Sequence, residues 1–449
     1  MKLRAMLLLG GLALVAGACK TRPAKTTAPT QTSVRDVSAR YLPDLDPLFD
    51  AYDSLTKRDQ HRDVAALLMG SNRDLRASQL YVYAATHYCK ANLPDSAAAA
   101  LHQAIDNGMA DPYILNKEPA LEGVKKASGW SQLESRLAAI RQDLGRQERF
   151  AVRTEPLETF WPYFDQALAD TLRARDRFKA YILKGSPAVR DYYVARYLNT
   201  NRMYDRMVRK SPDYYRYLKT YLNGDSLRQA REQTARMMTR FAGLYREAVF
   251  PDVNIMPGIL NSGGTATEVG LFIGGDMFGK SEGMPTQGFD EWNKSRINRL
   301  GGLPLIIVHE LMHFQQHYRD YDHANKVLGQ VISEGVCDFL AELCSGETLR
   351  DDKVRYLEQP ANRDFILAEF KKEMFTENTS NWLYNGSIKD RPVDIGYTLG
   401  YKIAKSYYER SADKQTAIYN LLNADSFATL VRESEYGYLL DDSPPPNTK

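Results

Sequence analysis

Apolar residues recur at two different spacings along the chain, and each spacing predicts a different secondary structure. From residue 41 to about 145, over 150–250 and again from 303 to about 435, they recur every three or four positions, which predicts helices. Segments 253–260 and 269–275, separated by the Gly-rich residues 262–264, instead predict two strands joined by a turn. The chain is therefore expected to be mainly α with a small β-sheet, an α+β fold.

Small and aromatic residues within 41–147 follow the spacing of a tetratricopeptide-type helical hairpin. They are Tyr81, Ala84, Ala85, Tyr88, Ala97, Leu101 and Ala104. Small side chains let two helices approach closely, and aromatic rings fill the groove between them. We therefore expect a tetratricopeptide-like helical domain over 41–147. It serves either as a surface for a protein partner or as a helical cap on the domain that follows.

The N-terminus has the pattern of an export signal. Lys2 and Arg4 precede an apolar run over 6–15, and small residues lead up to Cys19. This pattern predicts a secretory signal peptide over 1–18 rather than a membrane-spanning helix. Cys19 after small residues resembles the lipobox of bacterial lipoproteins, although Ala16 stands where an aliphatic residue is usual. The alternative is an ordinary cleaved signal with an incidental cysteine.

Two segments have too little apolar content to fold. Residues 19–40 are rich in Thr, Pro, Ala and Lys, which predicts a flexible tether behind the lipidated cysteine. Residues 441–449 predict a disordered tail. Lys20 follows Cys19 at the position where inner-membrane lipoproteins often carry Asp. The expected location is therefore the cell envelope, anchored by lipid to the outer membrane, with the protein facing the periplasm or the cell surface.

Length and charge narrow the functional classes. The 449 residues suggest two domains, and the net charge of +3 is nearly balanced. The helices over 150–250 are rich in Arg and Tyr, but acidic residues are interspersed among them. This predicts solvated helix faces and no nucleic-acid partner. The thiols of Cys89, Cys337 and Cys344 are expected to be buried as small apolar groups.

The segment 303–313 carries the strongest chemical pattern, with the sequence LPLIIVHELMH. Pro304 suits the first turn of a helix, and the apolar residues around it predict that this helix is buried. His309 and His313 are four residues apart, so both imidazoles project from one face and can bind one Zn²⁺. Glu310 lies beside them, where its carboxylate can take a proton from metal-bound water. The alternative, a buried helix with two hydrogen-bonded histidines, leaves the charged Glu310 unexplained.

A third ligand is expected from a second helix. Glu334 lies twenty-one residues after His313, which leaves room for a turn and an antiparallel return. Asp338 is one helical turn further on the same face, where it can accept the free N–H of a ligand histidine. Arg319 stands where a metzincin has its third histidine, so that class is excluded. H-E-x-x-H followed by E-x-x-x-D at this distance is the gluzincin arrangement, thermolysin-like in its ligands.

A wider set of motifs resembles one bacterial family over roughly residues 150–440. The motifs are PD at 251–252, SGGT at 262–265, GLFIG at 270–274, HELMHFQ at 309–315, NWLYNG at 381–386 and RPVDIGYTLGY at 391–401. In this order they look like the "predicted Zn-dependent protease" family, which is similar to the gliding-motility lipoproteins of the Bacteroidetes. With the ligand pattern, this resemblance implies a zincin-like metallopeptidase domain over 148–440.

The predicted reaction is hydrolysis of peptide bonds in a peptide or protein substrate. One Zn²⁺ ion and Glu310 activate a water molecule, which attacks a carbonyl polarised by the metal. The oxyanion needs a further hydrogen-bond donor, for which Tyr397 and Tyr384 are candidates, and Arg391 is the candidate for binding a substrate carboxylate. Each of the three is alternatively a packed core residue, and the chain contains 28 Tyr. Segment 269–273 is a candidate edge strand, on which an extended peptide could add.

The alternative class is a non-catalytic envelope lipoprotein. It would be a structural, gliding-associated or secretion-associated component that retains a zinc-peptidase fold. The tether and the helical repeat suit this interpretation. The intact set of Glu310, three metal ligands and Asp338 favours an enzyme, because a protein that no longer catalyses is expected to have lost at least one of them.

Replacing Cys19 with Ser is expected to release the protein from membrane fractions. The reason is that the thiol of Cys19 is the predicted site of lipid attachment. The measurement is the distribution of protein between pellet and supernatant after a high-salt wash. A variant that stays in the pellet would show that lipid on Cys19 is not the anchor.

Overall fold

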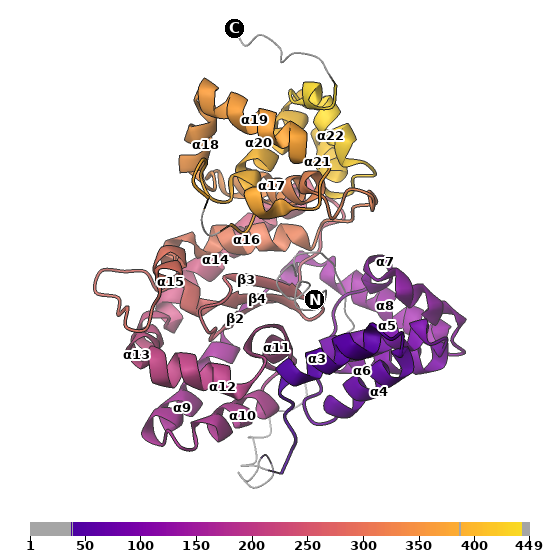
Figure 1. The fold of residues 1–449 in the computed structure, drawn as a ribbon, viewed down its shortest axis with the longest axis vertical. Coiled ribbons are helices and arrows are strands. Elements are labelled where there is room, and N and C mark those ends of the chain that lie inside the picture. The colour runs from indigo at the N-terminus through magenta and orange to yellow at the C-terminus, as the bar shows by residue number, and fades with distance from the viewer. Residues whose placement is uncertain (1–36, 38, 386–387, 442–449) are drawn as a thin grey trace. The chain divides into compact units, whose positions relative to one another are not determined.

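The computed structural model describes residues 37, 39–385 and 388–441 (Figure 1). The predicted signal peptide, Cys19, most of the tether and almost all of the C-terminal tail lie outside these residues and stay predictions. The chain divides into two compact units. We call residues 1–235 and 249–307 the N-terminal unit, and residues 236–248 and 308–449 the C-terminal unit. The domain boundary expected at 147/148 also stays a prediction.

The first part of the N-terminal unit is helical. Its elements are α3 (Leu45–Thr56), α4 (His61–Ser71), α5 (Ser78–Lys90), α6 (Pro94–Asp106), the short α7 (Ile114–Lys117) and α8 (Trp130–Leu144). Helices α5 and α6 form a hairpin in which Ala85, Ala97 and Leu101 are buried. Pro94 begins α6, where its missing N–H costs nothing. The hairpin lies where the small residues predict one, while its relation to tetratricopeptide repeats stays a prediction.

The second part of the N-terminal unit surrounds a small sheet. Its helices are α9 (Glu155–Ala169), α10 (Ala174–Lys184), α11 (Pro187–Tyr192), α12 (Thr200–Met203), α13 (Pro212–Tyr221), the first half of α14 (Gly224–Leu244) and α15 (Glu291–Arg296). Two π-helical stretches, Tyr193–Tyr197 and Tyr204–Lys210, follow α11 and α12. Many of the tyrosines in this region pack inside the unit, among them Tyr192, Tyr197 and Tyr215.

The sheet has four strands among the described residues, in the order β1-β2-β4-β3. They are β1 (Val152–Arg153), β2 (Val253–Met256), β3 (Gly264–Thr267) and β4 (Gly270–Gly274). Strand β2 is parallel to β1 and β4, whereas β3 and β4 form an antiparallel hairpin. The α+β fold expected from the sequence is confirmed.

One expectation about the sheet is wrong. Strand β4 contains most of segment 269–273, which the sequence suggested as an edge, but β4 lies between β2 and β3. Its backbone hydrogen bonds are therefore used on both sides, and an extended peptide cannot add to it. The reason is that part of the segment read as a Gly-rich turn continues into β3, a short strand of Gly, Thr and Ala that pairs with β4 along its whole length.

The C-terminal unit is helical. Its helices are α16 (Leu303–His313), which begins in the N-terminal unit, the second half of α14, α17 (Val327–Ser345), α18 (Asp351–Glu358), α19 (Pro360–Glu373), α20 (Ile395–Arg410), α21 (Lys414–Leu422) and α22 (Phe427–Glu433). Helix α17 ends at Gly346, whose φ of 81° is the left-handed conformation typical of a helix end. Cys337 and Cys344 are buried as expected, and Cys89 in the other unit is partly buried.

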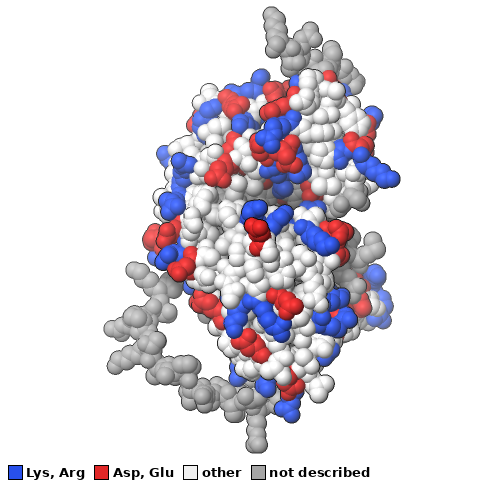
Figure 2. Space-filling view, turned by 90° about the vertical axis from the view of Figure 1, so that its left-hand side faces the viewer, with Lys and Arg blue, Asp and Glu red and all other residues white. Residues whose placement is uncertain are grey.

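The surface and the helices give two further observations. Figure 2 shows one face of the molecule, on which Lys and Arg are interspersed with Asp and Glu. Within the part of the chain that the structure describes, no helix is both long enough and apolar enough to cross a membrane.

Helices α17 and α20 pack side by side through glycine (Figure 1). A Cβ atom added to Gly400 would lie 1.8 Å from the carbonyl oxygen of Val331, and one added to Gly335 would lie 1.9 Å from the carbonyl carbon of Gly400. Both distances are far below any van der Waals contact, and the atoms met belong to the backbone. Only glycine at these two positions therefore allows the observed approach.

Replacing Gly400 with Ala is expected to lower the free energy of unfolding by about 1–3 kcal/mol or more, because the added methyl group forces two backbones apart. The measurement is urea or thermal unfolding of purified protein. Gly243 is a matched control: it lies in α14, and a Cβ added there meets nothing within 4 Å. Gly243→Ala should be neutral or slightly stabilising, and equal stability of Gly400→Ala and wild type would contradict the packing described here.

Candidate metal centre

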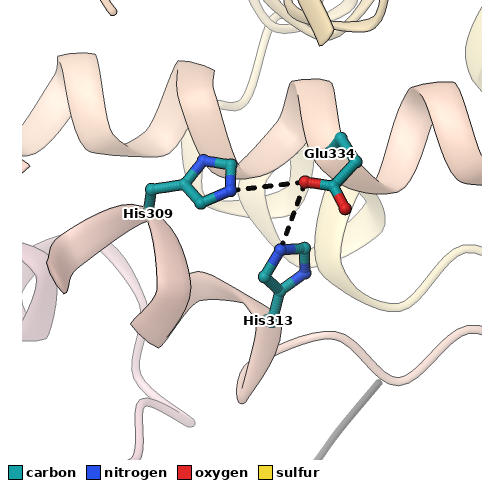
Figure 3. Close-up of side chains that lie close together, drawn as sticks. All are labelled: His309, His313 and Glu334. Atoms are coloured by element: carbon teal, nitrogen blue, oxygen red, sulfur yellow. Dashed lines mark ion pairs between the residues drawn. The ribbon is translucent and has the colours of Figure 1, made fainter. Parts of the chain in front are cut away.

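Helix α16 presents two histidines from one face to a carboxylate of α17 (Figure 3). The helix is apolar, and the side chains next to the histidines, such as Val308 and Met312, are fully buried. This packing fixes the helix, so the imidazoles of His309 and His313 lie one turn apart and point the same way. Pro304 lies in the first turn, as the sequence indicates.

The three side chains converge on one point. The Nε2 atoms of His309 and His313 lie 3.3 Å and 3.4 Å from Oε2 of Glu334. One donor atom from each residue lies within 4.8 Å of the others, and all three side chains are buried. Two imidazole nitrogens and one carboxylate oxygen form a donor set that suits a divalent transition metal, and zinc above all. The cluster is thus compatible with a metal site.

The electrostatics of the cluster favour a positive charge between the rings. Burial by itself lowers the pKa of His309, but the carboxylates of Asp338 and Glu334 outweigh it and bring the pKa to about 10. The pKa of Glu334 is held well below its usual range by His313 and His309, although burial opposes this shift. The carboxylates thus make the space between the rings favourable for a cation.

Asp338 orients His309. Its Oδ1 lies 2.7 Å from Nδ1 of His309, and an ionised carboxylate can only accept a hydrogen bond. Nδ1 therefore carries the proton, and Nε2 faces Glu334 as expected of a ligand. The other oxygen, Oδ2, accepts from Nε of Arg350 at 2.9 Å. Arg350 and His309 together outweigh the burial of Asp338 and lower its pKa, so the carboxylate stays charged.

Glu310 lies next to the ligands without belonging to the cluster. It follows His309 directly on α16, and it is only partly buried. The group of side chains that could hold one ion consists of His309, His313 and Glu334. Glu310 is thus partly accessible to solvent, directly after a candidate ligand in the chain.

Tyr384 contacts the carboxylate of Glu334. Its hydroxyl donates to Oε1 of Glu334 at 2.6 Å, while the residue as a whole is 51% exposed. Its φ of 57° is the left-handed conformation, which a tyrosine rarely adopts. Next to it, Asn385 and Asp394 exchange two hydrogen bonds, in which each side-chain oxygen accepts from the backbone N–H of the other residue. This pair fixes the backbone directly after Tyr384.

Tyr397 lies on α20 beside the same site. Its ring centre is 6.2 Å from that of His309 and 6.1 Å from that of Tyr384. Burial and the charge of Glu334 raise the pKa values of Tyr384 and Tyr397 well above the usual 10. Both phenols therefore keep their protons at neutral pH and are available as hydrogen-bond donors.

Arg391 is not brought to the cluster. Its guanidinium pairs with Asp390 at 2.9 Å and lies over the rings of Phe365 and Trp382, at 5.2 Å and 5.3 Å from their centres. No contact recorded for the described residues joins it to the metal ligands. Binding of a substrate carboxylate by Arg391 stays a prediction.

Sequence reasoning missed two side chains at the site. Arg350 pairs with Asp338, and its guanidinium lies 4.0 Å from the ring centre of Tyr397. It comes from the turn before α18, and no motif marks it. Gln316 lies beside His313, and its Oε1 is 3.0 Å from Nδ1 of that histidine. Helical spacing could not have found it, because α16 ends at His313 and Gln316 lies in the segment after the helix.

Comparison with known proteins gives one match. Residues 291–429 match the model of the family described as "Predicted Zn-dependent protease". The match covers less than half of the chain, and it includes His309, His313 and Glu334. No curated protein and no solved structure matches the chain. The similarity to gliding-motility lipoproteins stays a prediction.

Removing one ligand is expected to abolish stoichiometric metal binding. His309→Ala and Glu334→Ala should each reduce the metal content to little, because two remaining ligands hold an ion poorly. Asp338→Asn should weaken metal affinity about 10–100-fold, the usual effect of losing the partner of a ligand histidine. The measurement is elemental analysis after dialysis, with chelator-treated protein as the blank.

His317 provides the matched control for this prediction. It lies four residues after His313 but outside the group that could share one ion. His317→Ala should therefore keep the wild-type metal content. Full metal content in Glu334→Ala would show that the third ligand is a different residue.

Proposed function

We propose that this protein is a zinc-dependent peptidase of the gluzincin type. The observation that carries the proposal is the convergence of His309, His313 and Glu334 in a buried site, with Glu310 beside them. Three protein ligands leave a fourth coordination position for water or substrate, which distinguishes catalytic zinc sites from structural ones. The family match over residues 291–429 supports the same activity.

The residues around the site have separate roles in the proposed reaction. Zinc, when bound, would lower the pKa of a water molecule and polarise the substrate carbonyl. Glu310 takes the proton of the attacking water on its carboxylate and returns it to the departing amine. The hydroxyls of Tyr384 and Tyr397 remain protonated and can donate to the oxyanion that forms at the carbonyl.

Tyr384 supports the proposal more directly than Tyr397. Its hydroxyl already contacts the carboxylate of the candidate ligand, 2.6 Å from Oε1 of Glu334, and the residue as a whole is half-exposed. A donor in that position can turn from Glu334 to an incoming carbonyl without crossing the core. Tyr397 is 9% exposed, and it packs between Arg350 and His309.

We further propose that the enzyme works at the cell envelope, held by lipid on Cys19, and acts on peptides or proteins there. The support is the N-terminal sequence pattern. The fractionation of Cys19→Ser described above tests the anchor. The helical hairpin of α5 and α6 is the proposed surface for a protein partner. A pull-down that compares wild type with variants substituted on the exposed faces of this hairpin tests it.

Glu310→Gln is expected to abolish peptide hydrolysis while leaving the metal centre intact. Glutamine keeps the size and the hydrogen bonding of the side chain but cannot accept the proton, so the rate should fall by at least about two orders of magnitude. The measurement is digestion of a broad peptide library by wild type and variant at matched zinc content. Tyr384→Phe in the same digest should lower the rate and keep the zinc.

The control for Glu310→Gln is Glu409→Gln, the same substitution at an exposed position of α20. It should leave both zinc content and cleavage unchanged. Equal cleavage by Glu310→Gln and wild type would rule out Glu310 as the base. A wild-type protein that binds zinc and cleaves nothing would favour the alternative, a non-catalytic envelope lipoprotein with a zinc-peptidase fold.

A further inference from the structure

The two ligand histidines have chemically different partners. Nδ1 of His309 faces the charged carboxylate of Asp338, whereas Nδ1 of His313 lies 3.0 Å from the amide oxygen of Gln316 and 3.4 Å from the neutral thiol of Cys337. Gln316 follows the end of α16 and is fully buried. A buried amide must satisfy both its oxygen and its nitrogen, so its neighbours decide which way it points.

The contacts of Gln316 fix its orientation. Its Nε2 lies 2.7 Å from the main-chain carbonyl oxygen of Ser333, which can only accept a hydrogen bond. Nε2 also lies 3.2 Å from Sγ of Cys337. The amide nitrogen must therefore face α17, and Oε1 must face His313. In this orientation the hydroxyl of Ser333 donates to the same Oε1 at 2.8 Å.

The orientation of Gln316 then fixes the tautomer of His313. Oε1 of Gln316 is an acceptor, so Nδ1 of His313 at 3.0 Å must carry a proton and donate to it. In the neutral imidazole the lone pair is then on Nε2, the atom that faces Glu334 at 3.4 Å. The chain of hydrogen bonds thus begins at a backbone carbonyl of α17 and ends at a ligand atom of α16.

We propose that Gln316 is a positioning residue of the metal centre, which holds His313 in the tautomer and orientation that bind the ion through Nε2. This inference rests on the proposed zinc site and deepens it. Ser333 directly precedes Glu334, so the same turn of α17 supplies one ligand and orients another. The amide also adds no charge, whereas a second carboxylate partner would put a further negative charge beside the metal.

Metal affinity tests this proposal without any measurement of activity. Gln316→Leu removes the acceptor, so the dissociation constant for zinc, measured by competition with a chromophoric chelator, should rise about 10–100-fold. Gln316→Glu keeps an acceptor for Nδ1 of His313 but loses the N–H that binds the carbonyl of Ser333, so it should recover part of the affinity. Gln315→Leu is the matched control, because Gln315 is equally buried and its Nε2 donates to the carbonyl of Leu311 within α16. It should bind zinc like wild type.

A spectroscopic measurement separates positioning from a general structural role. In the cobalt-substituted protein, the ring N–H protons of His309 and His313 should give two shifted, solvent-exchangeable proton signals. Gln316→Leu should lose or broaden one of them, while Gln315→Leu keeps both. A Gln316→Leu protein that only unfolds more easily, with unchanged zinc affinity and both signals, overturns the proposal.

Each of the other possible outcomes also supports or overturns the role proposed for Gln316. If Gln316→Leu does not fold, Gln316→Glu carries the test: retained affinity supports the proposal, and a folded variant that has lost zinc overturns it. A wild-type protein that takes up no zinc or cobalt overturns the proposal together with the metal centre. A protein that binds zinc as described but hydrolyses nothing overturns the peptidase and leaves the role of Gln316 standing.

Discussion

The contact between Gly335 and Gly400 is the constraint on which the C-terminal unit depends. It lets α17 and α20 approach until the backbone of one meets the backbone of the other. Glu334 directly precedes Gly335, and Tyr397 lies three residues before Gly400, so the distance between the helices sets the distance between a metal ligand and the aromatic ring beside the site. A methyl group at this contact would move α20, and Tyr397 with it, away from Glu334 on α17.

Near this contact α17 carries two charged groups that are kept out of water. Glu334 and Asp338 are almost completely buried, and a buried carboxylate is costly unless a cation or hydrogen-bond donors compensate it. Asp338 is compensated by Arg350 and His309. Glu334 faces His309 and His313 and accepts from Tyr384. Both buried carboxylates are therefore paired with cationic or hydrogen-bonding groups, as a buried charge requires.

The sequence was sufficient for the parts of this site that local spacing determines. Two histidines four residues apart in an apolar helix must share a face, and a helix returning antiparallel can carry Glu334 and Asp338 together. Arg350 could not be found in this way, because its position depends on where the turn after α17 leads. The interior position of β4 was missed for a similar reason. Strand order follows from pairing with β2 and β3, and a single strand's pattern does not contain that information.

The apolar character of α16 bears on whether the protein folds before or after it binds an ion. Its ligands are held by buried side chains such as Val308 and Met312, and α17 is held by α20, so neither helix needs an ion to find its place. In small zinc-finger domains, by contrast, the metal builds the fold. Here the packing of α16 and α17 is expected to hold the three candidate ligands in place before an ion binds. Selectivity among competing ions would then depend on the geometry and the donor atoms of this site, and not on the free energy of folding.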